Sequence, residues 1–316
     1  MIKVLANDGI DKSAQQRLEA AGISVSSANI PQEVLLQRIN EFDVLTVRSA
    51  TKVRKPLIDV ISKTKLIVRA GVGLDNIDVD YAQAKGITVK NTPLASSQSV
   101  AELVFAHLFT GVRFLHQANR AMPQTGFDKF NDLKKAYSAG IELRGKTLGV
   151  IGFGNIGKAS ARIGLGLGMN IVAFDPFPVL NEVTLELFDR QRLHVKVPLV
   201  PMEDVLRNAD FITLHAAGSK AVIGPNEFAI MKRGAMLINC ARGGVVDENA
   251  LVEALTNGTI SFAGLDVFEN EPTPRKDLLI HPYVSLTPHI GASTAEAQLR
   301  IGEEVADIVL NFFKPA

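Results

Sequence analysis

Short apolar runs alternate with helical patterns from the beginning of the chain. The runs are rich in Val, Ile and Leu and lie at residues 2–8, 23–27, 43–49, 65–71 and 87–92. Helices are expected between them, at residues 13–21, 32–42 and 54–63. Continuous apolar runs of this length are typical of buried parallel strands. The alternation of strand and helix therefore predicts a doubly wound α/β sheet with right-handed crossovers.

A second series of the same kind begins at Lys146. Its apolar runs lie at residues 148–151, 171–174, 211–216, 234–241, 262–268 and 284–288. Helices are expected to begin near Met202, Pro225 and Asp247. A chain of 316 residues is long for one domain and suits two, each burying its own core. The two series therefore predict two doubly wound parallel-sheet domains.

Segments outside the strands set the predicted domain boundaries. Residues 99–121 contain one glycine and no proline and are expected to form a single long helix, whereas residues 127–145 look charged and irregular. Residues 293–313 have an amphipathic helical pattern. Because a lone helix cannot form a domain, we expect this one to pack on the N-terminal series. The first domain is then discontinuous, at 1–96 and 291–316, and residues 97–290 form the second.

Composition excludes several classes of partner. Lys and Arg number 34 against 33 Asp and Glu, so there is no general attraction to nucleic acid or to an anionic membrane. The apolar runs are far shorter than the ~20 residues that span a bilayer, and no N-terminal targeting pattern is present. Cys240 is the sole cysteine, which excludes an intrachain disulfide and a four-cysteine zinc site. A soluble, cytoplasmic protein with small-molecule partners and no metal is expected.

A glycine-rich loop opens the second series. Gly152, Gly154 and Gly157 stand in G-x-G-x-x-G order between an apolar run and a helical pattern, and Asp175 ends the next apolar run. This unit is typical of dinucleotide binding, with the pyrophosphate at the helix N-terminus and the acid on the ribose hydroxyls. An ordinary tight turn is the alternative, but it requires no acid at that place. The carboxylate would repel a 2′-phosphate, so the sequence favours NAD over NADP.

Three later segments each present one group suited to hydride transfer. Arg242, Glu271 and His289 follow successive apolar runs, and the carboxyl ends of strands line the ligand crevice of a doubly wound sheet. A guanidinium can bind a substrate carboxylate bidentately, and a histidine paired with a carboxylate can exchange a proton near neutral pH. Together they predict oxidation of a 2-hydroxy acid. Taken singly, each has a structural alternative, such as helix capping by the arginine. The other histidines show no comparable pattern.

Several longer segments carry a family resemblance. NCARGGVVDENALVEAL, GLDVFENEP and TPHIGASTAEA, with GFGNIGK and FDP, resemble the D-isomer-specific 2-hydroxyacid dehydrogenases along nearly the whole chain. VRSAT, VRAGVGLDNID, VKNTP and SVAELV are most similar to the D-3-phosphoglycerate dehydrogenase branch. The resemblance implies a Rossmann domain for NAD and a flavodoxin-like substrate domain. It also implies that Arg242 binds substrate, that His289 is the acid/base and that Glu271 is its partner.

The same resemblance implies further contacts. Cofactor contacts are expected from backbone groups of Asn155, Ile156, Ala216, Cys240, Ala241, Gly291 and Ala292, and from the Asp266 carboxylate to the nicotinamide carboxamide. Val72 and Gly73 would donate backbone hydrogen bonds to the substrate carboxylate. One departure lies at residues 215–220, where the proline that commonly follows the histidine in this family is missing. A homodimer through the nucleotide-binding domain is also implied.

Substrate choice depends on a second set of cations. Arg48 and Arg69 end neighbouring apolar runs and match phosphate-contacting arginines of the phosphoglycerate branch. Lys134 and Lys135 are either further phosphate contacts or part of a solvated loop. Since the chain stops at Ala316, the short form without a C-terminal regulatory domain is expected, and with it no serine feedback.

The resulting hypothesis is NAD-dependent oxidation of D-3-phosphoglycerate to 3-phosphohydroxypyruvate, the first step of serine biosynthesis. One alternative is a glyoxylate, hydroxypyruvate or D-lactate type reductase of the same family. A more remote alternative is an NAD(H)-sensing interaction module, because a corepressor branch of the family keeps the same Arg, Glu and His.

Overall fold

The computed structural model describes residues 1–218 and 220–314, so Ser219 in the atypical loop lies outside the described residues. Backbone contacts divide the chain into two units, Met1–Ser97 with Ala292–Ala316, and Gln98–Gly291. The predicted boundaries lie one residue from these. Within the described residues, no helix is both long and apolar enough to cross a membrane.

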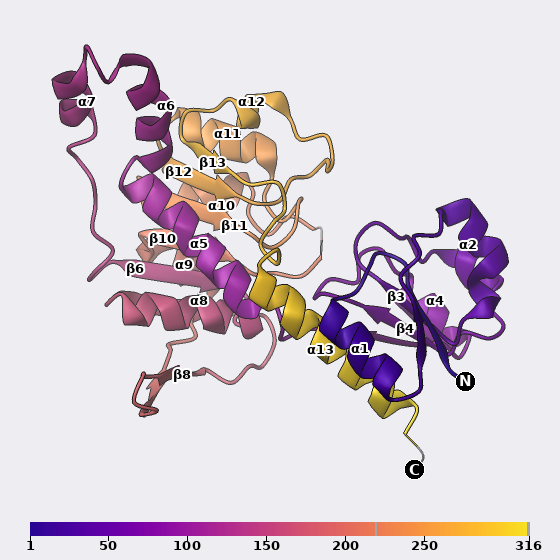
Figure 1. The fold of residues 1–316 in the computed structure, drawn as a ribbon. Coiled ribbons are helices and arrows are strands. Elements are labelled where there is room, and N and C mark those ends of the chain that lie inside the picture. The colour runs from indigo at the N-terminus through magenta and orange to yellow at the C-terminus, as the bar shows by residue number, and fades with distance from the viewer. Residues whose placement is uncertain (219, 315–316) are drawn as a thin grey trace. The chain divides into compact units, whose positions relative to one another are not determined.

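The first unit contains a five-stranded parallel sheet (Figure 1). Its strands lie in the order β2-β1-β3-β4-β5, the flavodoxin-like order, with a topological switch point between β1 and β3. The strands are β1 (Lys3–Ala6), β2 (Ser24–Ser26), β3 (Val44–Val47), β4 (Leu66–Arg69) and β5 (Thr88–Asn91). Each lies inside one of the predicted apolar runs.

Helices cover both faces of this sheet. On one face, Leu18 of α1 (Lys12–Ala20) and Val305 of α13 (Ala295–Phe312) pack in a core cluster with Val4. On the other face, Leu35 of α2 and Ile58 of α3 pack against the strand side chains that point to that face. The helices on this second face are α2 (Gln32–Arg38), the 3-10 turn η1 (Ile39–Glu41), α3 (Lys55–Asp59) and α4 (Val79–Ala84). The terminal helix α13 therefore completes the first core.

The second unit contains a six-stranded parallel sheet in the order β13-β12-β11-β10-β6-β7. An isolated parallel bridge joins Ala173 of β7 to Leu199, at the edge where a Rossmann sheet carries its third strand. The strands are β6 (Thr147–Ile151), β7 (Asn170–Phe174), β10 (Phe211–Leu214), β11 (Ala235–Asn239), β12 (Ile260–Leu265) and β13 (Val284–Leu286). The predicted α/β class with two doubly wound sheets is confirmed.

Two clusters of buried side chains cover the faces of the second sheet. One joins Leu108 of α5 and Ala161 of α8 to inward residues of the strands, and the other joins Leu206 of α9 and Leu251 of α11. The helices of this unit are α5 (Ser97–Val112), α8 (Asn155–Gly166), α9 (Met202–Asn208), α10 (Pro225–Ile230), α11 (Glu248–Thr256) and α12 (Lys276–Leu279).

The segments between the two series differ from the prediction. The single helix expected at residues 99–121 is wrong, because α5 ends at Val112 and α6 (Leu115–Thr125) begins after Phe114, whose φ of 55° is left-handed. The segment expected to be irregular contains α7 (Phe130–Ala136). An antiparallel hairpin, β8 (Glu182–Glu186) with β9 (Arg192–Lys196), was not predicted. Among its ten strand residues, Val183 alone is buried, so it lacks the apolar run that marks a core strand.

Candidate functional site

The glycine loop follows β6 at the switch point of the second sheet. Gly152 has a φ of 92°, and a Cβ built on it would lie 2.7 Å from the His215 carbonyl oxygen. A Cβ on Gly157 would overlap the Gly152 carbonyl oxygen, whereas one on Gly154 would meet no atom within 4 Å. Two of the glycines are thus required by close backbone packing. The third leaves its backbone exposed to open space.

The loop leads into the N-terminus of α8. Asn155 begins this helix, and its N-cap Gly154 has no side chain to accept from the first-turn amides. Helix N-termini of this kind bind phosphate through their amides and dipole. The residues therefore fit a dinucleotide pyrophosphate, with Asn155 and Ile156 at the expected place.

Asp175 follows β7 and is fixed beside the glycine loop. Its Oδ2 accepts a hydrogen bond from the Phe153 amide at 2.7 Å, and its Oδ1 accepts one from the Phe177 amide at 3.0 Å. Each oxygen keeps further lone-pair capacity for a ribose hydroxyl. A 2′-phosphate at the same place would be repelled by the carboxylate, so the arrangement fits NAD better than NADP.

Replacing Asp175 by alanine is expected to raise the use of NADP relative to NAD, because the repulsion of a 2′-phosphate is removed. The measurement is kcat/KM for each cofactor with one hydroxy acid. Asp189→Ala, which removes a carboxylate from the β8–β9 turn, is the matched control and should leave the ratio unchanged. A wild-type preference for NADP would contradict this account of Asp175.

His215, at the end of β10, is a buried structural histidine. Its Nε2 lies 3.1 Å from both Ser160 Oγ and Thr213 Oγ1. Burial lowers the pKa of His215 to about 3, so the ring stays neutral. Burial also raises the pKa of the Cys240 thiol, which therefore stays protonated. Neither group is suited to catalysis, and any cofactor contact at Cys240 would involve its backbone.

The neutral state of His215 predicts a pH-dependent stability. Its pKa falls from 6.5 in the unfolded chain to about 3 in the folded one, so its contribution to the free energy of unfolding is complete above pH 6.5. As the pH falls below 6.5 the unfolded histidine takes up a proton, and this contribution is lost by about 1.4 kcal/mol per pH unit. Urea unfolding from pH 7 to pH 5 should show a shallower decline for His215→Gln than for the wild type. Equal declines would contradict the assignment.

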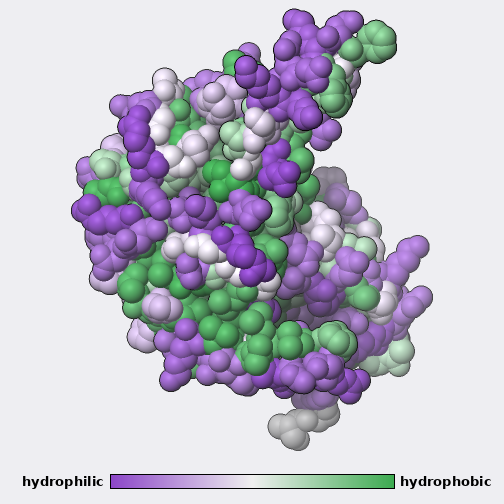
Figure 2. All heavy atoms as spheres, turned by 90° about the vertical axis from the view of Figure 1, so that its left-hand side faces the viewer, coloured by the Kyte–Doolittle hydropathy of each residue, from purple (hydrophilic) through white to green (hydrophobic). Residues whose placement is uncertain are grey.

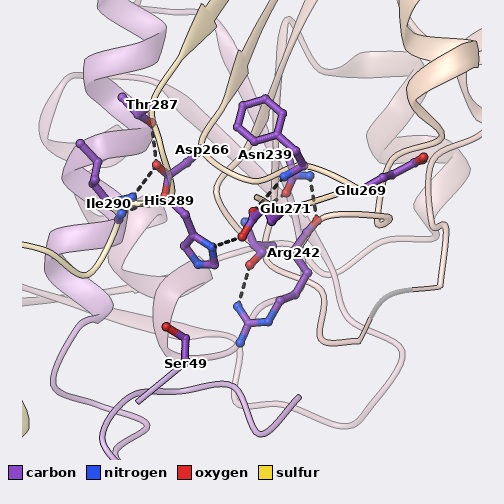
Figure 3. A network of polar contacts seen from close by, with 12 residues as sticks. Ser49, Asn239, Arg242, Asp266, Glu269, Glu271, Thr287, His289 and Ile290 are labelled. Atoms are coloured by element: carbon purple, nitrogen blue, oxygen red, sulfur yellow. Dashed lines mark hydrogen bonds and ion pairs between the residues drawn. The ribbon is translucent and has the colours of Figure 1, made fainter. Parts of the chain in front are cut away.

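Asp266 follows β12 and holds the turn that carries His289 (Figure 3). Its Oδ1 accepts hydrogen bonds from Thr287 Oγ1 at 2.6 Å and the Ile290 amide at 2.8 Å, and its Oδ2 accepts one from the Gly291 amide at 2.8 Å. The Asp266 carbonyl accepts from the His289 amide at 2.8 Å. His289 itself is left-handed, with a φ of 54°. Asp266 therefore fixes an uncommon backbone conformation at the predicted acid/base.

Glu271 and His289 form the expected pair. His289 Nδ1 lies 2.8 Å from Glu271 Oε2, and the Phe268 amide donates to Glu271 Oε1 at 3.0 Å. The carboxylate thus holds a proton on Nδ1, which leaves Nε2 as the nitrogen that can take a proton from a substrate. Both side chains remain partly open to solvent, at 49% for His289 and 36% for Glu271. This is the geometry of a general acid/base.

Arg242 follows β11, and its side chain extends beside the Glu271–His289 pair in Figure 3. Its Nη1 donates to the Ala241 carbonyl at 2.6 Å. Asn239 fixes the same loop, since its Nδ2 donates to the Arg242 carbonyl at 3.0 Å and its Oδ1 accepts from the Ala241 amide at 3.0 Å. Sequence reasoning missed Asn239, although an amide ending an apolar run is an available signal.

The predicted substrate residues of the first unit lie at the carboxyl ends of its strands. Arg69 is the last residue of β4 and lies in register with Val47, the last residue of β3. Arg48 is the next residue after β3, so the two arginines lie at neighbouring strand ends. Both arginines are half-buried. The Val72 carbonyl accepts from Asn91 Nδ2 at 2.6 Å, which fixes the loop that contains Gly73.

Asp8 and Asn76 organise the loop of Arg48, and neither was singled out from the sequence. Asp8 Oδ2 accepts from the amides of Arg48 at 2.7 Å and Thr51 at 3.1 Å. Asn76 Nδ2 donates to the Arg48 carbonyl at 2.7 Å. A hollow of about 240 Å³ opens here, lined in part by Asp8, Arg48 and Gln298. It lies at the switch point of the first sheet, where open α/β sheets bind ligands.

The predicted residues are divided between the two units. The second contains Arg242, Glu271 and His289 with the cofactor candidates Gly152, Gly154, Asn155, Ile156, Gly157, Asp175, Ala216, Cys240, Ala241, Asp266 and Gly291. The first contains Ala292 and the four substrate candidates. Lys134 and Lys135 are exposed in the last turn of α7. Among the described residues, no group of three or more His, Cys, Asp or Glu is placed to hold a metal.

Comparison with known proteins identifies the family. Residues 105–291 match the model described as D-isomer specific 2-hydroxyacid dehydrogenase, NAD binding domain. The chain belongs to this family. The matched residues lie within the second unit and include the glycine loop, Asp175 and the Glu271–His289 pair, so the predicted family and cofactor are confirmed.

The relatives are named either as dehydrogenases or as reductases. The chain is 42% identical over 313 residues to a D-3-phosphoglycerate dehydrogenase of Methanocaldococcus jannaschii, covering 97% of this chain and 56% of that protein. It thus spans about half the length of that relative. It is also 42% identical over 312 residues to a hydroxypyruvate reductase of Thermotoga maritima, covering 96% of each. A solved glyoxylate reductase from Paecilomyes thermophila is 28% identical, with a TM-score of 0.84 over 98% of this chain and 94% of that one.

Proposed function

We propose that the chain oxidises D-3-phosphoglycerate to 3-phosphohydroxypyruvate with NAD, the first step of serine biosynthesis. The observation that carries the reaction type is the 2.8 Å contact between His289 and Glu271, next to Arg242 and in the NAD-binding unit. The observation that favours the phosphorylated substrate is the placement of Arg48 and Arg69 at adjacent strand ends. A phosphate dianion is strongly hydrated and needs such cations when it leaves water.

Each residue of the site has a defined part in this reaction. Bound NAD supplies the acceptor for the hydride that leaves C2 of the hydroxy acid. His289 Nε2 takes the proton of the 2-hydroxyl, so the alcohol becomes a ketone as one hydride and one proton leave. Glu271 stabilises the protonated imidazole. Arg242 binds the carboxylate with its planar fork and stabilises charge on the reacting oxygen.

A second candidate is a hydroxypyruvate or glyoxylate reductase. It is favoured by the relative from Thermotoga maritima, which matches over 96% of both chains at the same identity as the phosphoglycerate dehydrogenase. The same three residues would serve this reaction in the direction of reduction. The two candidates differ in the need for a substrate phosphate.

A substrate panel tests the proposal. NADH formation is measured with D-3-phosphoglycerate, D-glycerate and D-lactate, and NADH consumption with hydroxypyruvate and glyoxylate. The proposal expects the highest kcat/KM for the phosphorylated acid. Equal or better use of hydroxypyruvate and glyoxylate would establish the second candidate. NADH binding without turnover of any acid would indicate the NAD(H)-sensing alternative.

Arg48→Ala and Arg69→Ala are expected to weaken 3-phosphoglycerate much more than D-glycerate, since the phosphorylated acid alone presents a dianion. Each lost charge-assisted contact is worth roughly 1.5 to 3 kcal/mol, or about one to two orders of magnitude in binding. The measurement is KM for both acids in each variant. Arg54→Ala, which removes a surface cation paired with Asp78, is the matched control. Equal losses on both acids would make the two arginines structural.

We also propose a homodimer formed through the second unit. Several large apolar side chains around α6 and α7 are exposed, namely Leu115, Met122, Phe127, Phe130 and Ile141. Figure 2 shows the side that faces left in Figure 1; near its top, at the height of α6 and α7, a few hydrophobic residues lie among polar ones, and the larger hydrophobic areas lie lower. Light scattering should give twice the chain mass, and the mass of one chain would contradict the proposal.

A further inference from the structure

A buried histidine on α5 connects to the turn that carries His289. His107 is 2% exposed and lies between two hydroxyl side chains at the end of β13. Its Nδ1 is 2.9 Å from Ser285 Oγ, and its Nε2 is 3.1 Å from Thr287 Oγ1. Thr287 is the residue whose hydroxyl donates to Asp266 Oδ1 at 2.6 Å. A continuous chain of hydrogen bonds therefore runs from α5 to Asp266.

The direction of each hydrogen bond follows from the chemistry of the groups. The Asp266 carboxylate can only accept, so the single hydroxyl proton of Thr287 points towards it. Thr287 Oγ1 must then accept from His107, which places the ring proton on Nε2. His107 Nδ1 is left as an acceptor for the Ser285 hydroxyl. This arrangement has a neutral ring, which agrees with burial lowering the pKa of His107 to about 4.

The neighbouring backbone is shaped for this ring. Gly264 lies on β12, two residues before Asp266, and a Cβ built on it would lie 2.6 Å from His107 Cβ and 2.8 Å from its Cγ. The absence of a side chain at Gly264 therefore lets the imidazole lie against β12, the strand that ends just before Asp266. The ring is held by packing on one side and by two hydroxyls on its edges.

We propose that His107 is a positioning residue for the acid/base, acting through Thr287 and Asp266 to hold the left-handed turn at His289. Asp266 Oδ1 accepts from both the Thr287 hydroxyl and the Ile290 amide, and its Oδ2 accepts from the Gly291 amide. A fixed Thr287 hydroxyl therefore holds in place the Asp266 carboxylate, which accepts the hydrogen bonds of the turn. The proposal rests on the proposed function, because it assumes that His289 takes the substrate proton.

The experiment breaks this chain of hydrogen bonds at two residues. His107→Met and Thr287→Val are each expected to lower kcat by roughly ten- to a hundredfold, because small misplacements of a reacting group carry costs of that size. KM for the hydroxy acid should stay near wild type, since Arg242 is untouched. The double variant should lose no more than the worse single one, because both break the same chain. Thr287→Ser, which keeps the hydroxyl, should retain wild-type kcat.

A matched control separates positioning from packing. Leu108→Ala removes a fully buried apolar side chain that follows His107 on the same helix, and should lower the melting temperature while leaving kcat unchanged at temperatures where the protein is folded. Unchanged kcat in Thr287→Val, or losses that add in the double variant, would overturn the proposal. If His107→Met fails to fold, Thr287→Val and Thr287→Ser still decide it.

A readout without turnover distinguishes this proposal from the proposed function. In ¹⁵N spectra of the imidazole groups, His107 should carry its proton on Nε2. In Thr287→Val the Nδ1 proton of His289, held by Glu271, should exchange with water faster than in the wild type. If the wild-type protein oxidises no hydroxy acid, the proposed function is wrong. If the His289 Nδ1 proton exchanges at the same rate in Thr287→Val as in the wild type, the positioning role is wrong.

Discussion

Replacing His289 by alanine is expected to lower kcat by roughly a hundred- to ten-thousandfold, the usual cost of losing a general acid/base. The imidazole is the group that takes the hydroxyl proton, and its Nδ1 is held 2.8 Å from Glu271 Oε2. The cofactor residues of the glycine loop and Asp175 are not altered, so NAD affinity should stay near wild type. The measurements are kcat from initial rates and the NAD dissociation constant by fluorescence titration.

His281→Ala is the matched control for this variant. His281 lies on the same unit, eight positions earlier in the chain, and its Nδ1 accepts from the Tyr283 amide without contacting Glu271. This variant should keep wild-type kcat. A His289→Ala protein that retains more than about a tenth of the wild-type rate would exclude His289 as the acid/base, since the expected loss starts near a hundredfold.

Replacing Arg242 by alanine is expected to lower kcat/KM by roughly two to four orders of magnitude, if both charge-assisted bonds of a bidentate contact are lost. The carboxylate and the reacting oxygen are common to 3-phosphoglycerate and D-glycerate. The two acids should therefore be impaired alike, in contrast to the Arg48 and Arg69 variants. The measurement is kcat/KM for both acids.

Two further variants sharpen this result. Arg242→Lys keeps the charge but loses the planar fork, so it should recover part of the activity. Arg233→Ala removes an exposed arginine that donates to the Asn257 carbonyl at 3.3 Å, and it should have no effect. Selective loss on the phosphorylated acid alone would mean that Arg242 binds the phosphate instead of the carboxylate.

The parallel strands were predictable because a strand buried on both faces requires continuous apolar sequence. Three of the four residues in each of β3, β4 and β10 are Val, Ile, Leu or Phe. The glycine loop was also predictable, since Gly152 and Gly157 stand where any side chain would collide with backbone. At these positions the local sequence alone is enough to predict the structure.

Other features depend on contacts that no local pattern shows. The break between α5 and α6 lies at Phe114, a bulky residue in a left-handed conformation that sequence normally assigns to glycine. The β8–β9 hairpin buries a single strand residue, so its sequence resembles a loop. His107 is 178 and 180 positions from Ser285 and Thr287, and the α/β topology alone brings them together. Its role could not be read from α5.

The most direct measurement is NADH formation by the purified chain with the two enantiomers of 3-phosphoglycerate and with D-glycerate, at saturating NAD. The proposed function predicts NADH from D-3-phosphoglycerate, a lower kcat/KM with D-glycerate, and no NADH with the L-enantiomer. No NADH from D-3-phosphoglycerate, or equal rates with both enantiomers, would contradict it.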